Sequence, residues 1–233
     1  MPLLHYDKLL TSQNVVLDMP FYKNGLCDGG KAIDKSKYHN NATIIGATWT
    51  PPYGYSCDGV DDYLDVGSPA ALNISNGDFS IHLVYSTVDT GAKYLASHYK
   101  TGLGGAIGDS GWWIGINGAN ITAIVINNND LSYYTPSVNV GANNGLYHEV
   151  VLTRAANAYT LSFDGNNVNS GTTNNTLNIS NINNTMLGKT SWTNLYVACT
   201  IPEFQIKTVA LSAAEIKQHY LSAKRRMPWA NLP

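Results

Sequence analysis

The sequence predicts an all-β protein, an antiparallel two-sheet sandwich closed by one short helix. Strand-like runs recur roughly every 8–15 residues with Gly, Asn and Pro between them, which favours a sandwich over βαβ units. The clearest run, 79–88, alternates strictly, because Phe79, Ile81, Leu83 and Tyr85 take one side and the residues between them take the other. Tyrosine outnumbers phenylalanine 15 to 4 among many Asn, Gly, Thr and Ser residues, a balance typical of strands joined by long surface loops.

The remaining strands follow from short apolar or alternating runs. Two turns mark hairpins: Gly118-Ala119-Asn120 between two apolar runs, and Asp164-Gly165 after an alternating one. Residues 166–184, rich in Asn, Thr and Ser, are interpreted as low complexity. In chain order, the expected strands are 14–21, 42–49, 53–58, 62–66, 79–88, 93–99, 105–107, 112–117, 121–127, 131–134, 147–154, 159–164, 186–189 and 195–207.

The single expected helix covers 212–223. Ser212 and Glu215 have the spacing of a capping box, and Leu211 and Ile216 that of a hydrophobic staple. The basic run 224–226 lies where cations suit the helix dipole. We therefore divide the 233 residues into an N-terminal arm over 1–13, one sandwich domain over 14–223 and an extended tail over 224–233.

The stretch 57–66, CDGVDDYLDV, combines a turn with several carboxylates. Gly59 allows a tight turn, and Asp side chains bond back to the backbone there. The same oxygens suit a hard cation such as Ca²⁺. Both interpretations stay open, and the candidate metal ligands are Asp34, Asp58, Asp61 and Asp62.

Three stretches in this order, 34–43, 58–66 and 203–220, resemble the laminin-G-like, concanavalin A-like lectin/glucanase superfamily. The resemblance spans about 14–222. It implies a jelly-roll β-sandwich with roughly five to seven strands in each sheet. Many members hold one Ca²⁺ with acids from the first strands and the last strand. Here Pro202 stands at the usual aspartate of that last strand, which weakens the case for calcium.

The sequence gives little support for a catalytic function. Glucanases on this fold carry paired carboxylates at alternate positions of one strand. The three glutamates, Glu149, Glu203 and Glu215, have no carboxylate two residues away. A polysaccharide lyase would need a Tyr/His pair near Arg or Asn. His82, His98, Tyr85, Tyr99 and Arg154 are available for that alternative.

A binding reading centres on Trp112 and Trp113. Neighbours on a strand point to opposite faces, so only one ring can enter the core and the other is exposed or covered by a loop. Asp109, Asn117, Tyr133 and Tyr134 would complete a carbohydrate site around the exposed ring. In the opposing interpretation, both tryptophans pack in the core.

Charge and cysteine content narrow the context. The formal net charge is −2, only 13% of residues are charged, and no basic stripe indicates nucleic acid. No apolar run predicts a membrane span, and no signal peptide is recognised, so the location is unknown, with an extracellular or virion setting favoured. Cys27 and Cys57 could pair in an oxidising compartment, leaving Cys199 free, or all three are reduced.

The expected function is therefore non-catalytic recognition or assembly. One form is lectin-like carbohydrate binding. The other is a structural virion component, such as a capsid decoration, fibre or tail protein, that docks on neighbouring subunits or a homo-oligomer through arms at 1–13 and 224–233. A glycan-active enzyme on the same fold is the alternative.

Overall fold

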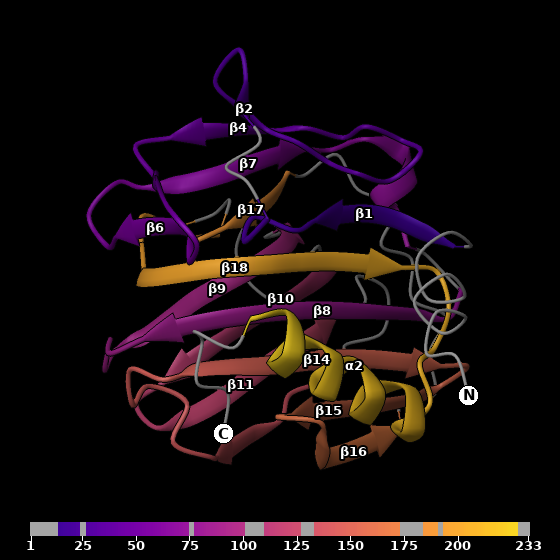
Figure 1. Cartoon of the computed structure of the whole chain (residues 1–233). Coiled ribbons are helices and arrows are strands. Elements are labelled where there is room, and N and C mark those ends of the chain that lie inside the picture. Colours follow the sequence, from indigo (N-terminus) through magenta and orange to yellow (C-terminus); the bar gives the residue numbers. More distant parts are fainter. Residues whose placement is uncertain are drawn as a thin grey trace.

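The chain folds as two antiparallel sheets packed face to face, with one helix outside them (Figure 1). This computed structural model describes residues 14–23, 27–74, 77–100, 110–126, 133–172, 184–190 and 193–227. The expected all-β sandwich is confirmed. Among the described residues, no helix is long and apolar enough to cross a membrane.

Sheet A is organised around β18, its longest strand. One edge of β18 pairs with β8, while β6 and β1 share the other edge, at residues 198–201 and 204–207 respectively. In order, the sheet contains β16 (Asn166–Thr172), β15 (Ala158–Phe163), β14 (Tyr147–Ala155), β8 (Phe79–Thr87), β18 (Ala198–Lys207), β6 (Gly54–Asp58) and β5 (Thr48–Thr50), with β1 (Val15–Met19) beside β18.

Sheet B lies behind sheet A, and its strand β10 carries Trp112 and Trp113. Its strands include several of two or three residues, so the described part has more strands than the roughly five to seven expected. In order, it contains β12 (Tyr133–Tyr134), β11 (Asn120–Ile126), β10 (Ser110–Asn117), β9 (Ala92–Lys100), β17 (Thr185–Leu187), β7 (Tyr63–Gly67), β4 (Ala42–Ile45), β3 (Lys31–Ala32) and β2 (Cys27–Asp28), with β13 (Ser137–Asn139) beside β11.

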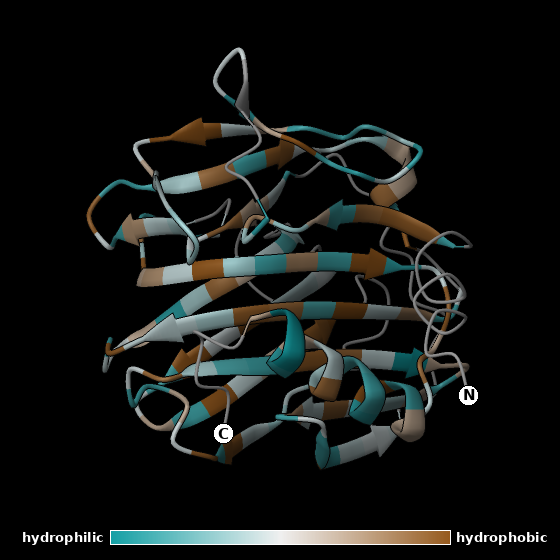
Figure 2. Cartoon of the chain, viewed as in Figure 1, coloured by the Kyte–Doolittle hydropathy of each residue, from teal (hydrophilic) through white to brown (hydrophobic). Residues whose placement is uncertain are grey.

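Alternation along the strands builds the core between the sheets. In Figure 2 the strands of sheet A change repeatedly between hydrophobic and hydrophilic residues along their length. On β8, Phe79, Ile81, Leu83 and Tyr85 are completely buried and face sheet B, as their period of two predicted. The residues between them face outward, and α2 lies over part of this outer face.

Helix α2 (Ala213–Arg226) begins where the sequence predicted it. Ser212 and Glu215 form the capping box, and Leu211 and Ile216 pack together with Val151 of β14. The helix continues to Arg226, so the expected tail boundary at 224 was too early. Residues 224–226 form its basic last turn, where positive charge faces the unpaired carbonyl groups.

One sequence interpretation needs correction, and one open alternative can be narrowed. The Asn-rich stretch after 165 is partly a strand, β16, because Asp164 and Gly165 both take positive φ and turn the chain back along β15. Cys57 is a free thiol, as in the reduced alternative, and it lies in register with the free thiol of Cys199 across β6 and β18. Cys27, the partner considered for Cys57 in an oxidising compartment, is in β2, and its side chain is outside the described residues.

Candidate functional site

The two tryptophans of β10 point to opposite sides of sheet B, as a strand requires. Trp112 is 0% exposed and packs in the core near Phe204 and His98. Trp113 is only half-buried and lies on the outer face. Of the pair, Trp113 is therefore the ring that can meet a ligand, and the assignment of Trp112 to the binding surface is wrong.

Of the other expected site residues that the structure describes, Asn117 shares a face with Trp113 and Tyr134 does not. Tyr134 is 6% exposed and stacks on Tyr159 at 5.4 Å in the core, so its assignment to the site is also wrong. Asn117 is exposed at the end of β10, on the same face as Trp113. Asp109 and the side chain of Tyr133 lie outside the described residues.

Two aromatic pairs instead define what we call the aromatic surface of sheet B: Tyr94 with Trp113, and Tyr63 with Tyr196. Tyr94 on β9 meets Trp113 edge to face, with ring centroids 5.2 Å apart. Tyr63 on β7 and Tyr196 lie 6.1 Å apart. Since β17 separates β7 from β9, the two pairs are about two strand spacings, or roughly 10 Å, apart. All four rings are half-buried, so each keeps some accessible surface.

Lysines give this surface its polar character. The Lys189 Nζ lies over the rings of Tyr63 and Tyr196, at 4.6 and 4.8 Å from their centroids. Lys93 Nζ donates to the Tyr196 carbonyl oxygen at 2.7 Å, which holds the 193–197 segment against the sheet. Burial raises the pKa of Tyr94, so its hydroxyl stays protonated as a hydrogen-bond donor at neutral pH. Flat aromatic faces with such donors are suited to the apolar sides and hydroxyl groups of sugars.

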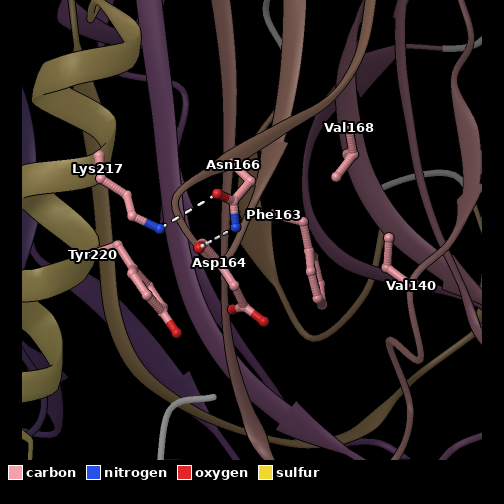
Figure 3. A pocket seen from close by; sticks show the side chains of 7 residues that line it. All are labelled: Val140, Phe163, Asp164, Asn166, Val168, Lys217 and Tyr220. Atoms are coloured by element: carbon pink, nitrogen blue, oxygen red, sulfur yellow. Dashed lines mark hydrogen bonds between the residues drawn. The ribbon is translucent and has the colours of Figure 1, made fainter.

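A concave region lies between α2 and the β15–β16 turn (Figure 3). Its volume is about 440 Å³, and Phe163 and Tyr220 supply its aromatic walls. The polar groups are already engaged, because Lys217 donates to Asn166 at 3.3 Å and the carboxylate of Asp164 accepts from His148 at 2.8 Å. A ligand that used these polar groups would have to break these bonds. The aromatic surface of sheet B offers four half-buried rings, and we take it as the candidate site.

The expected metal ligands separate into two places. Oxygens of Asp58, Asp61 and Asp62 lie within 4.8 Å of one another in an exposed turn, where Asp58 also accepts from the Val60 amide. These three supply only part of the six to eight oxygens that Ca²⁺ takes.

Asp34 does not belong with them. It is 0% exposed, and its two oxygens accept from the amides of Asp18, Ser36 and Asn40 and from the Ser36 hydroxyl. Asp34 therefore organises the turn that follows β3, and its assignment as a metal ligand is wrong.

The acids considered for catalysis are away from the aromatic surface. Glu149 and Glu203 are buried on the outer face of sheet A, against α2. Burial lowers the pKa of the neighbouring His82 to about 4 and raises that of Glu149. The pKa of Glu203 is lowered to about 2, since the Arg226 guanidinium and the two histidines outweigh the effect of burial. The lyase candidates His82, His98, Tyr85, Tyr99 and Arg154 are likewise buried.

Sequence reasoning missed Tyr63, Tyr94, Lys189 and Tyr196. Tyr63 and Tyr94 occupy outward positions of expected strands, and the alternation of side chains along a strand was enough to predict this. Their meeting with Trp113 and Tyr196 depends on the strand order β10–β9–β17–β7, which a single sequence does not contain.

Comparison with known proteins agrees with this fold. The laminin-G-type family described as the concanavalin A-like lectin/glucanases superfamily matches residues 58–217, more than half of the chain, and the chain belongs to it. No curated protein matches.

Similar solved structures include the binding domain of Paraclostridial Mosquitocidal Protein 1 (15% identity, TM-score 0.68) and the binding domain of Botulinum Neurotoxin DC in complex with SialylT (14%, 0.68). The match covers 90% of this chain and 52% of each of those chains, so this chain spans about half their length. At this identity the likeness concerns the fold.

Proposed function

We propose that the chain is a non-catalytic recognition module that binds carbohydrate on the aromatic surface of sheet B. The observation that carries the proposal is the half-buried Trp113, held edge to face by Tyr94 on the same outer face as Tyr63 and Tyr196. A sugar ring would stack on an aromatic face, and its hydroxyl groups would bond to the tyrosine hydroxyls of the same surface.

The superfamily name itself includes lectins and glucanases, so the fold allows either activity. Two observations favour binding. The buried Glu149 and Glu203 lie on sheet A, away from the aromatic surface. Among similar structures, the binding domain of Botulinum Neurotoxin DC is described once in complex with SialylT and once in complex with rat synaptotagmin II, and both descriptions concern binding rather than catalysis.

Glycan-array binding of the full chain tests the proposal. Trp113→Ala should weaken binding by roughly 30-fold, the effect of removing about 2 kcal/mol at a central aromatic contact. Tyr53→Ala is the matched control, because Tyr53 is an exposed tyrosine (38%) that precedes β6, on sheet A. Unchanged glycan binding by the Trp113 variant, or equal loss in the Tyr53 control, would refute the assignment. Absence of any glycan binding by the wild type would refute the carbohydrate class itself.

Assembly on neighbouring protein subunits is the second proposal. It rests on the arm expected over 1–13 and the tail expected to follow α2. Residues 1–13 and 228–233 lie outside the described residues. Light scattering on the full and trimmed chains tests it, since an oligomer that depends on the terminal segments would favour a structural role in a particle. A monomer that is unaffected by both truncations would exclude that role.

A further inference from the structure

A cluster of buried polar side chains lies between the outer face of sheet A and α2, on the opposite side of the molecule from the aromatic surface. It contains His82 from β8, Glu149 from β14, Glu203 from β18 and His219 from α2. The four residues are between 0% and 6% exposed. They come together because β14, β8 and β18 are adjacent strands and α2 lies over β14 and β8, ending beside β18 (Figure 1).

One oxygen organises the two imidazoles. Glu149 Oε1 is 2.7 Å from His82 Nε2 and 3.0 Å from His219 Nδ1. A carboxylate accepts hydrogen bonds, so each ring places its N–H on Glu149 and carries its lone pair on the other nitrogen. Glu149 therefore sets the tautomer of both histidines, as an outer carboxylate does for histidines that bind a metal.

The cluster contains buried acceptor atoms that have no hydrogen-bond partner. Within the described part of the chain, His82 Nδ1 and Glu149 Oε2 are buried without a hydrogen-bond partner. The same is true of Oε1 of Gln205, which lies directly opposite His82 in the β8–β18 register. Unpaired buried polar atoms are costly and rare, so the lone pair of His82 Nδ1 is available to a cation.

The spacing suits a metal ion. One ligand atom from each of His82, Glu203 and His219 lies within 4.8 Å of the other two. Ligands of a tetrahedral zinc ion are about 3.4 Å apart, given metal–ligand bonds of about 2.1 Å. Small side-chain rotations would close the difference. Two neutral imidazoles with one carboxylate form a donor set that zinc and neighbouring transition ions accept.

We propose that His82, His219 and Glu203 form a binding site for a divalent transition-metal ion, best matched by Zn²⁺, with Glu149 orienting both histidines. The bound ion would join α2 to β8 and β18. It would act as a clamp on the helix, independently of any ligand on sheet B.

Arg226 competes with a metal ion for the carboxylate of Glu203. Its Nη2 lies 3.0 and 3.3 Å from the two carboxylate oxygens of Glu203, from the last turn of α2. Its side chain is 26% exposed, so it can swing toward solvent when a metal takes Glu203. Removing the guanidinium should therefore strengthen metal binding, which a purely structural ion pair would not predict.

Thermal unfolding of the full chain, stripped with a chelator and then titrated with ZnCl₂, tests the site. Zinc at about 100 times its Kd should raise Tm by roughly 5–10 °C for a domain of this size. Co²⁺ should give the visible absorption of a tetrahedral nitrogen and oxygen site. Absence of both signals in the wild type would overturn the proposal.

Variants locate the ion. His82→Gln and His219→Gln keep an amide near Glu149 but replace the imidazole nitrogen that would bind zinc, so both should lose the zinc-induced shift. His148→Gln is the matched control, because His148 is also buried against a carboxylate, that of Asp164. It should keep the shift. Zinc stabilisation that survives both cluster variants would place the ion elsewhere and overturn the assignment.

Arg226→Ala provides a second test if His82→Gln and His219→Gln fold poorly. It should bind zinc more tightly than the wild type, by about 10-fold or more, since the competing cation is gone. Equal or weaker zinc affinity in this variant would count against the site.

Discussion

His98 connects the pH dependence of stability to a single buried ring. It is 0% exposed on β9, bonds through Nδ1 to the Thr185 hydroxyl at 2.9 Å, and stacks near Trp112. Burial lowers its pKa from 6.5 to about 4. Between pH 6.5 and about pH 4, His98 is protonated in the unfolded chain but neutral in the folded chain. The free energy of unfolding therefore falls as the pH is lowered through this range.

The magnitude follows from the two pKa values. Each pH unit between the folded and unfolded pKa is worth about 1.4 kcal/mol. When the pH is lowered from about 7.5 to about 5, the free energy of unfolding should fall by about 2 kcal/mol, because His98 stays neutral in the folded chain and becomes protonated in the unfolded one. Near pH 4 and below, the loss approaches about 3 kcal/mol.

Urea unfolding of wild type and His98→Gln, at about pH 7.5 and about pH 5, measures this contribution. Glutamine can still bond to Thr185 but does not titrate, so the variant should lose about 2 kcal/mol less than wild type on acidification. His39→Asn is the control, because His39 is exposed in a turn with φ of 52° and asparagine tolerates that backbone. Equal acid losses in wild type and His98→Gln would refute the reasoning.

Further predictions concern the core, the helix, the acidic turn and the termini. Trp112→Ala should destabilise the fold by about 3–5 kcal/mol in urea unfolding, since the ring is completely buried; a cost below about 1 kcal/mol would contradict its place in the core. Ser212→Ala should lower the free energy of unfolding by about 1 kcal/mol, because it removes the side chain that caps α2. Ser212→Asp should keep most of that stability, because aspartate can also cap a helix. If the 58–62 turn binds Ca²⁺, EGTA should lower Tm and Asp61→Asn should abolish the effect, whereas no shift with EGTA would exclude that ion. Deleting 1–13 should leave a folded chain, and a lost melting transition would show that this segment belongs to the domain.

Local patterns were enough to predict the elements that depend on neighbours in sequence. The alternation of Phe79–Tyr85 predicted the buried face of β8, because successive side chains of a strand point to opposite sides. The capping box at Ser212 and the Asp164-Gly165 turn were predicted correctly for the same reason, since their hydrogen bonds and dihedral angles involve residues three or fewer positions apart.

The candidate sites were decided by tertiary structure. The sequence required Trp112 and Trp113 to face opposite ways, but only packing against sheet A determined that Trp112 is the buried one. Tyr94 and Trp113 meet because β9 pairs with β10 in one particular register.

The buried cluster shows the same division most clearly. Glu149 and Glu203 have no acidic neighbour along their own strands, and the sequence alone therefore indicated isolated acids. The order β14–β8–β18 and the position of α2 bring both acids to His82 and His219. Hydrophobic alternation specifies which way a side chain points, whereas the order of strands in the sheet decides which distant side chains it meets.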